Sequence, residues 1–145
     1  MSLETNRAVV RRYFEGDGNG HDNTDAWADI CAPDMTVIAP VLPAPVRGLD
    51  AVLGFTRAMH AAFDGLSLTC GDLVAEGDQV AAEWTMAGTH TGPLPLPTGE
   101  LPPTGRAISI TGTSVCTLVD GRLVEERVQG DWLGMLAQLG ALPGG

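Results

Sequence analysis

The stretch DGRLVEERVQGDWLGMLAQLG, residues 120–140, decides the fold of this chain. Asp120–Gly121 suits the tight turn of a β-hairpin, because both positions of such a turn need positive φ. Asp131 stands directly before an apolar run with helical spacing, and Gly140 follows that run. This is the pattern of a helix with a side-chain N-cap and a C′ glycine. The stretch therefore predicts a strand pair followed by a capped C-terminal helix.

Four strand-like runs fill the chain before this helix. They are predicted at 66–74, 79–90, 107–118 and 123–130. GTHTG (88–92) predicts a strand that ends in a polar corner, and PPTGR (102–106) predicts a Pro/Gly-rich loop. The runs of apolar residues are short and alternate with polar ones, which is typical of a curved antiparallel sheet.

The first half of the chain is predicted to be mostly helical. Helices are predicted at 3–15, around Trp27 and Ile30, and at 49–63, with a short strand at 35–41. Ser2 is the predicted N-cap of the first helix, and Asn23 or Thr24 caps the second, which Pro33 ends. Three helices, a sheet and a closing helix make an α+β domain.

Composition narrows the class of protein. A chain of 145 residues with 44% hydrophobic content predicts one domain, residues 1–145. A net charge of -10 argues against nucleic acid and against an anionic membrane as partner. There is no run of 18 apolar residues and no signal-peptide pattern, so we expect a cytoplasmic protein. Cys31, Cys70 and Cys116 lack metal-ligand spacing and are predicted to be buried free thiols, without a metal.

Strand alternation predicts which polar side chains point inward, because residues two apart share a face. On the last strand, the apolar set is Val124, Glu126, Val128 and Gly130. On the strand before it, the inward polar residue is Ser114. On the 79–90 strand, Trp84 and His90 belong to the inward set, and Glu83 points outward.

Glu126 is the predicted catalytic residue. A carboxylate among apolar groups loses hydration of its charged form, so we expect a raised pKa and a role as general base or acid. The alternative is a glutamate that reaches solvent or pairs with Arg106 or Arg127. His90 is a second catalytic candidate, as a proton shuttle or a donor to a substrate carbonyl. Its alternative role is to anchor the adjacent loop through the backbone.

Several apolar and aromatic residues are predicted to line a substrate site at the open end of the core. Helical stripes supply the first part of this set and inward strand positions the second. The predicted substrate-binding residues are Tyr13, Trp27, Phe55, Met59, Trp84, Ser114 and Val128.

GTHTG, PPTGR and residues 120–140, with RAVVRRYFE and RGLDAVLGFTRAMHAAF earlier in the chain, make this sequence resemble the SnoaL-like polyketide cyclases. The resemblance implies an NTF2-like cone, with a curved mixed or antiparallel sheet wrapped around about three helices plus a C-terminal helix. It also implies a pocket for a small hydrophobic substrate, and a homodimer through the outer face of the sheet.

The residues depart from the pattern of ring-closing members of that family. Their last-strand aspartate base falls here on Val128, and their two assisting histidines fall on Ser114 and Glu126. Val37 and Ile38 stand where relatives often place Asp or His. The loop GPLPLPTGELPPTGR is also longer than in the family, which we expect to reshape the pocket mouth.

Three functions follow as hypotheses. The first is a cofactor-independent enzyme that performs acid/base proton transfer, an aldol-type cyclisation or isomerisation, on a polyketide-like or polycyclic carbonyl substrate. The second is an epoxide hydrolase or epoxide-opening cyclase, which needs Arg106 or Arg127 turned inward beside Glu126 and Glu83. The third is a non-catalytic binder of a hydrophobic metabolite, which Val37, Ile38 and Val128 favour.

Overall fold

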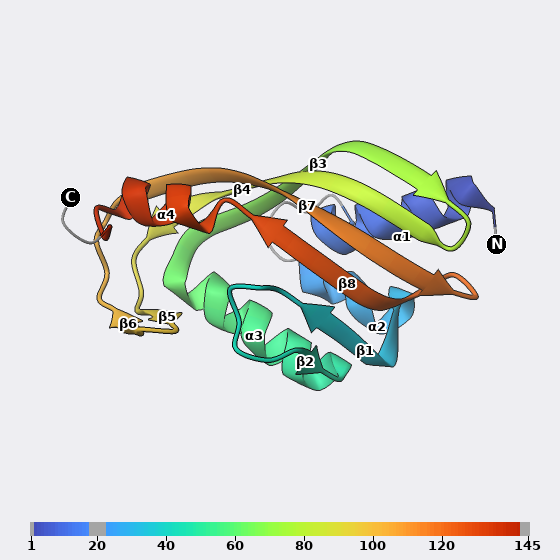
Figure 1. The fold of residues 1–145 in the computed structure, drawn as a ribbon, viewed down its shortest axis with the longest axis horizontal. Helices are drawn as coiled ribbons and strands as arrows, with labels where there is room; N and C mark the ends of the chain where they lie inside the picture. The colour runs from blue at the N-terminus through green and yellow to red at the C-terminus, as the bar shows by residue number, and fades with distance from the viewer. Residues whose placement is uncertain (1, 18–22, 143–145) are drawn as a thin grey trace.

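A six-stranded curved sheet forms the centre of the computed structural model, which describes residues 2–17 and 23–142 (Figure 1). The strand order is β2-β1-β8-β7-β4-β3. The strands are β1 (Cys31–Ile38), β2 (Val46–Arg47), β3 (Phe63–Glu76), β4 (Gln79–His90), β7 (Ala107–Val119) and β8 (Arg122–Gly130). Neighbours pair antiparallel except β1 and β8, which run parallel. The sheet is therefore mixed, and the predicted α+β class is confirmed.

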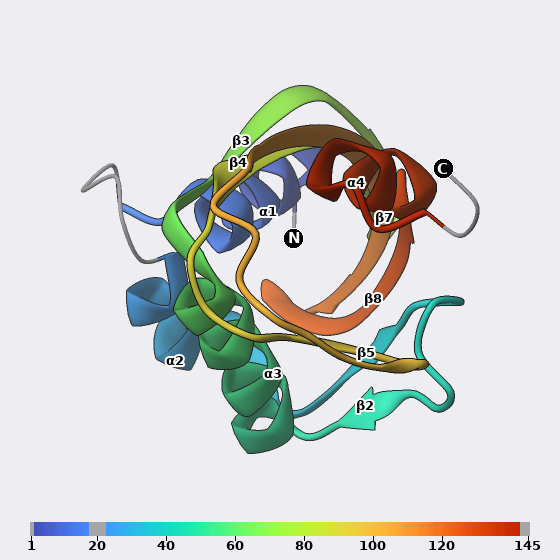
Figure 2. The same cartoon turned by 90° about the vertical axis from the view of Figure 1, so that its left-hand side faces the viewer.

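The predicted hairpin between the last two strands is confirmed. Asp120 has φ 52° and Gly121 has φ 77°, so both central residues adopt the positive φ that this turn requires. The pairing of β3 with β4 is interrupted between Asp64 and Ser67 and again between Cys70 and Leu73. Such bulges increase twist and curvature, and the sheet wraps partly around its own core (Figure 2).

The helices cover the inner side and the ends of the sheet (Figures 1 and 2). They are α1 (Leu3–Glu15), the 3-10 helix η1 (Asn23–Ala26), α2 (Trp27–Ile30), α3 (Leu49–Ala62) and α4 (Trp132–Leu139). The Ser2 side chain accepts a hydrogen bond from the Thr5 backbone N–H at 3.0 Å, which confirms the predicted N-cap. The loop predicted after α1 falls partly on residues 18–22, outside the described residues.

Pro33 does not end a helix, so that prediction was wrong. The second helical segment already stops at Ile30, and Pro33 lies inside β1. A proline cannot donate a ladder hydrogen bond, so it is tolerated in a strand only where pairing is interrupted. The register between β1 and β8 is irregular between Cys31 and Thr36, which is where Pro33 stands.

α4 closes one end of the sheet and confirms the predicted C-terminal helix. Asp131 accepts from the Gly134 N–H at 2.9 Å, and Gly140 adopts φ 72° after the last turn. The Gln138 side chain accepts from Ser109 N–H at 2.7 Å and donates to Ser109 C=O at 3.0 Å. Its amide takes the place of a strand beside β7 and satisfies backbone groups that β8 no longer reaches.

The sequence predicts an irregular Pro-rich loop after β4. The structure shows instead that part of this segment is regular. It contains a small hairpin, β5 (Leu94–Leu96) and β6 (Gly99–Leu101). Leu94 is 1% exposed and joins the main hydrophobic core. This hairpin therefore packs against the domain next to α3 (Figure 2).

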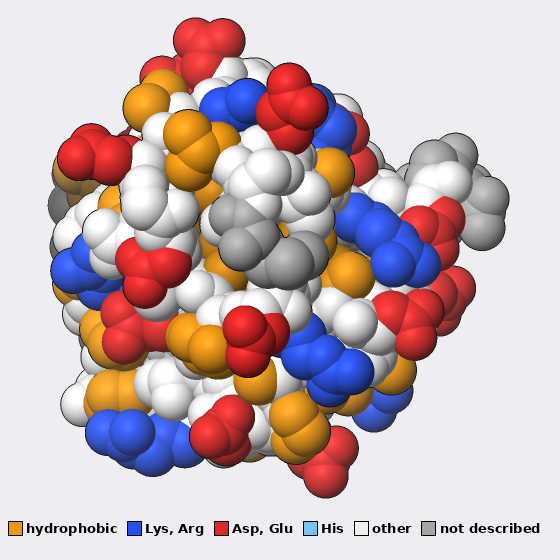
Figure 3. Space-filling view, turned by 90° about the vertical axis from the view of Figure 1, so that its right-hand side faces the viewer, with side chains coloured by type: hydrophobic (Ala, Val, Ile, Leu, Met, Phe, Trp, Pro, Cys, Tyr) orange, Lys and Arg blue, Asp and Glu red, His pale blue; other side chains and the backbone are white. Residues whose placement is uncertain are grey.

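The surface mixes both signs of charge in spite of the net charge of -10. On the end of the molecule that carries the β7–β8 turn, acidic and basic side chains lie among apolar ones (Figure 3). All eight basic residues of the sequence are arginines. Within residues 2–17 and 23–142, no helix is both long and apolar enough to cross a membrane.

Candidate active site

Glu126 lies on the inner face of the sheet, near the middle of β8. Its register partners are Cys116 on β7 and Val37 on β1, and both are buried. Only 6% of Glu126 is exposed. The enclosure of this carboxylate by apolar neighbours, expected from strand alternation, is confirmed.

Two hydroxyl groups hold the Glu126 carboxylate. The Tyr13 phenol donates to Oε1 at 2.7 Å, and the Ser114 hydroxyl donates to Oε2 at 2.7 Å. The Trp84 indole N–H in turn donates to Ser114 Oγ at 3.0 Å. Each carboxylate oxygen therefore has a partner, and the side chains form one buried polar network.

Tyr13 is positioned by its backbone as well as by its ring. Its ring stacks on Trp27, with ring centroids 4.5 Å apart and an angle of 19° between planes. Its carbonyl lies in the last turn of α1, where helical acceptors are free. That carbonyl accepts from Trp27 Nε1 and from Asn23 Nδ2, each at 3.0 Å. The segment after α1 thus fixes the residue that contacts Glu126.

Burial sets the protonation behaviour of this network. It raises the pKa of Glu126 above the ordinary value of 4.5, and the bonds from Ser114 and Tyr13 oppose that rise. Burial, reinforced by the Glu126 charge, raises the pKa of Tyr13 well above its usual range. Burial likewise raises the pKa of Cys31 to about 12. Tyr13 therefore stays a donor at neutral pH, while Glu126 is the group able to exchange a proton.

Glu126 should make stability depend on pH. A pKa that is higher in the folded state means that the unfolded state loses its proton first as pH rises. The contribution of Glu126 to the free energy of unfolding should fall from about pH 4.5 upward, by at most about 1.4 kcal/mol per pH unit, until the folded carboxyl ionises. Urea denaturation of wild type and Glu126→Gln at several pH values measures this. A difference between the two proteins that does not change with pH would contradict it.

The predicted alternation of β8 was wrong at one end of the strand. Leu123, assigned to the outer set, is fully buried, and Val124, assigned to the inner set, is only half-buried. The ladder to β7 shifts here, with Leu123 opposite Leu118 and Glu125 opposite Thr117. Val124 is the extra residue of a β-bulge, which reverses the alternation on its N-terminal side.

His90 anchors the adjacent loop, which is the alternative role expected for it from the sequence. Its Nδ1 accepts from the Thr104 N–H at 3.1 Å and lies 2.9 Å from Thr104 Oγ1. His90 is fully buried, and its Nε2 has no partner among the described residues. The β4 residue in the Glu126 row is Val80, ten positions away along the strand. The structure therefore does not bring His90 and Glu126 together.

The other predicted binding residues divide into two groups. Tyr13, Trp27, Trp84 and Ser114 are all buried and connected to Glu126 through the contacts above. Val128, half-buried, is the register partner of Ser114. On α3, however, Phe55 is 40% exposed and Met59 is half-buried. Phe55 thus contributes an exposed side chain and no wall beside Glu126.

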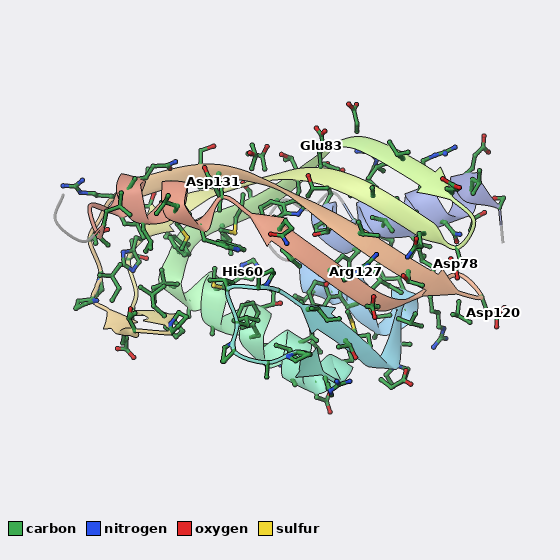
Figure 4. The ribbon with its side chains drawn as sticks, viewed as in Figure 1. His60, Asp78, Glu83, Asp120, Arg127 and Asp131 are labelled. Carbon is green, nitrogen blue, oxygen red and sulfur yellow. The ribbon has the colours of Figure 1, made fainter. Side chains whose placement is uncertain are left out.

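The charged set that epoxide opening needs is not assembled. Arg106 and Arg127 are exposed, and Arg127 Nε lies 3.7 Å from Glu125 Oε1. Glu83 is exposed and points away from the sheet on its outer side (Figure 4). Within the described part of the chain, no arginine forms an ion pair with Glu126.

Hollows open on the surface of the described structure, and Trp84 of this network lines one of them. One hollow of about 360 Å³ lies on the outer side of the sheet, lined by residues that include Glu83, Thr85, Thr111 and Thr113. A second, of about 400 Å³, lies between α1 and β3 beside Arg7 and Arg11. Glu126 lines neither of them. Glu126 is 6% exposed and both of its carboxylate oxygens are bonded to protein hydroxyl groups, so the pocket that the resemblance implies beside it stays a prediction.

Trp132, whose ring lies near Trp84, was missed by sequence reasoning, which assigned it only to a helical stripe. Its ring centroid lies 6.3 Å from that of Trp84. The signal was present as two glycines in the inward sets, Gly112 and Gly130, which face each other across β7 and β8. Paired glycines on an inner face leave room that large side chains from elsewhere occupy.

The comparison with protein families gives a clear match. The sequence model of the SnoaL-like polyketide cyclase family matches residues 7–139. The comparison with curated proteins gives no match.

Solved structures with this architecture cover nearly the whole chain. TsrD from Streptomyces laurentii is 27% identical, with a TM-score of 0.81, over 98% of this chain and 99% of that one. IdmH from Streptomyces antibioticus, a candidate polyketide cyclase, is 28% identical, with a TM-score of 0.72, over 97% and 99%. A candidate SnoaL-like polyketide cyclase from Jannaschia sp. CCS1, 24% identical over 97% and 95%, has a TM-score of 0.82 and supports the fold alone.

Proposed function

Because this chain belongs to the SnoaL-like polyketide cyclase family, we propose that it is an enzyme that moves a proton on a polyketide-like carbonyl substrate through Glu126. The observation that carries the proposal is the buried Glu126 carboxylate, held by Tyr13 and Ser114 at 2.7 Å each, with a pKa above the ordinary value. Such a carboxylate is a stronger base when ionised than one in water.

The proposed reaction begins with the ionised Glu126. The carboxylate takes the proton from a carbon that lies between two carbonyl groups, and the C–H electron pair moves onto a carbonyl oxygen as an enolate. The enolate carbon then attacks a second carbonyl carbon of the same substrate and forms the new C–C bond. The proton held by Glu126 passes to the resulting alkoxide, so no redox equivalent is needed. If the enolate is reprotonated elsewhere instead, the product is an isomer.

Tyr13 and Ser114 have positioning roles in this proposal. They orient the carboxylate before substrate arrives, which reduces the reorganisation needed in the reaction. As a substrate carbonyl develops negative charge, either hydroxyl can turn from Glu126 toward that oxygen. Trp84 orients Ser114 through its N–H. The non-catalytic binder remains the competing function, because apolar side chains such as Val37 and Val128 surround Glu126.

The first step is tested with 2-acetoacetylfluoren-9-one, a flat ring ketone whose side chain is a β-diketone with a CH₂ between its two carbonyls. In D₂O, the protein should accelerate deuterium incorporation at that CH₂ above the buffer rate, as followed by proton NMR. A binder would bind the diketone without accelerating exchange, and that result overturns the proposal. In ¹⁸O-labelled water, label in a carbon–oxygen bond formed by opening an epoxide probe would instead support hydration.

The homodimer expected from the resemblance stays a prediction. It would bury part of the outer face of the sheet, where Glu83 and the threonine side chains of the outer hollow lie. Analytical ultracentrifugation measures the oligomeric state directly.

A further inference from the structure

His90 holds the loop of residues 102–106 with one ring nitrogen, and its other ring nitrogen has no partner among the described residues. The Thr104 backbone N–H donates to Nδ1 at 3.1 Å, so Nδ1 presents a lone pair. In a neutral imidazole the hydrogen is then carried by Nε2. Nε2 is buried and finds no acceptor within residues 2–17 and 23–142. The neutral ring therefore satisfies the loop and leaves a buried N–H unpaired, which is unfavourable.

Thr104 is the residue that attaches this loop to the domain. It is half-buried, while the other four residues of the loop are exposed. Its hydroxyl accepts from the Arg106 N–H at 3.3 Å, so its own hydrogen can point to His90 Nδ1, 2.9 Å away. The His90 backbone also donates to Arg106 C=O and accepts from Gly105 N–H, each at 2.8 Å. These contacts close the base of the segment 91–103, which carries the β5–β6 hairpin.

Arg106 connects the same loop to α4. A Cβ atom placed at Gly140 would lie 3.0 Å from Arg106 Nη1, so the guanidinium lies beside the C-terminal end of that helix. A cation is favourable there, because the last carbonyls of a helix carry partial negative charge. The loop thus joins His90 on β4 to the end of α4, and its release would affect both elements.

The surroundings of His90 offer a positive charge no partner. His90 is 0% exposed, and its ring packs against Phe63, with ring centroids 5.4 Å apart. The ionisable residues nearest to it along the elements around it are His60 on α3, Asp64 on β3, Glu83 on β4, Glu100 on β6 and Arg106 in the loop. The four charged members of this set are exposed, and β5, β7 and α4 carry no charged residue. No ion pair of the described residues includes His90, so an imidazolium buried there would be uncompensated.

We propose that the loop 102–106 is a pH-sensitive latch, which opens when His90 takes up a proton. An imidazolium has a hydrogen on both nitrogens, so it cannot accept from the Thr104 N–H. When the loop moves away, both ring N–H groups reach water, including the one that lacks a partner in the closed form. The open form therefore binds a proton that the closed form does not, and low pH favours the open form. This inference does not depend on the proposed function.

Hydrogen exchange of the Thr104 amide in the full chain tests the latch, followed by ¹H–¹⁵N NMR between about pH 8 and pH 5. Relative to the intrinsic exchange rate, exchange should become faster by up to about tenfold per pH unit below about pH 6.5, where an exposed imidazole takes up its proton. The Gly48 amide, which donates to Met35 C=O at 2.7 Å at the start of α3, should show no such acceleration. His90→Gln is the matched variant, because its side-chain oxygen can accept from the Thr104 N–H but does not ionise. It should abolish the acceleration.

A relative exchange rate of Thr104 that does not change with pH in the wild type overturns the proposal, and so does an acceleration that persists in His90→Gln. If His90→Gln does not fold, two-bond ¹H–¹⁵N NMR of the histidine rings in the wild type replaces it. The His90 ring should carry its hydrogen on Nε2 at about pH 8. As the pH falls, its second protonation and the loss of the closed-form Thr104 amide signal should share one midpoint. A hydrogen on Nδ1 at about pH 8, or two different midpoints, overturns the proposal.

Discussion

Replacement of Glu126 by glutamine is expected to reduce the rate of deuterium exchange into 2-acetoacetylfluoren-9-one by a factor of about 10²–10⁴, the usual contribution of a general base. Glutamine has the same shape, and its carbonyl oxygen can still accept from one of the two hydroxyl groups, while its NH₂ group donates to the oxygen of the other. It cannot accept a proton at neutral pH. Binding of the diketone, measured by calorimetry, should change by less than about threefold, because the apolar walls are unaltered.

Glu125→Gln is the matched control for this experiment. It changes the neighbouring residue of the same strand, which is only partly buried and lies near Arg127 rather than in the Glu126 network. We expect exchange rates close to wild type. If Glu126→Gln keeps wild-type exchange while it binds the diketone normally, Glu126 is a structural residue and the catalytic proposal is wrong.

Strand alternation was sufficient to place Glu126, Ser114 and Trp84 on one inner face, because β4 and β7 pair without interruption from Thr89 to Gln79. Alternation could not foresee the bulge at Val124, since the extra residue is visible only in the pairing of two strands. Leu123 was assigned outward for that reason. The local sequence specifies a period of two, but the register decides where that period starts.

The partner of Glu126 could not be predicted from the sequence. Tyr13 lies 113 positions away, and its helical stripe indicated burial without indicating what it contacts. Pro33 could not be placed from the sequence for a similar reason. A proline is typical of a helix end, but here it lies in β1, where the pairing with β8 is interrupted, and that interruption is visible only in the structure. His90 was placed correctly on the inner face, but its distance from Glu126 along β4 depends on how the strands align.

Substitution of Gly112 by alanine is expected to cause a large loss of stability. A Cβ atom at this position would lie 2.2 Å from Trp84 Cζ2 and 2.7 Å from the Gln129 carbonyl oxygen. The indole cannot swing away without breaking its bond to Ser114, and the carbonyl belongs to the backbone of β8. Overpacking of this kind costs about 3 kcal/mol, which corresponds to a decrease in Tm of about 10 °C for a chain of this size.

Gly54→Ala provides the opposite expectation with the same chemical change. Gly54 is exposed in the interior of α3, and no atom lies within 4 Å of a Cβ placed there. Alanine should raise the free energy of unfolding by about 0.5–1 kcal/mol through helix propensity. Urea denaturation of both variants measures the contrast, and comparable effects of the two substitutions would show that the inner face has more room than the glycine geometry indicates.

A double-mutant cycle measures how much of the stability lost in Gly112→Ala comes from the contact with Trp84. Trp84→Phe removes the ring atoms nearest to the new methyl group, so Gly112→Ala should cost at least about 1 kcal/mol less in that background. The contact with Gln129 remains, and the relief should therefore be incomplete. Additive free energies of unfolding would mean that the backbone contact alone excludes a side chain at 112. In that case Gly112 and Gly130 serve the close pairing of β7 and β8, and the indole rings only fill the space that the two glycines leave.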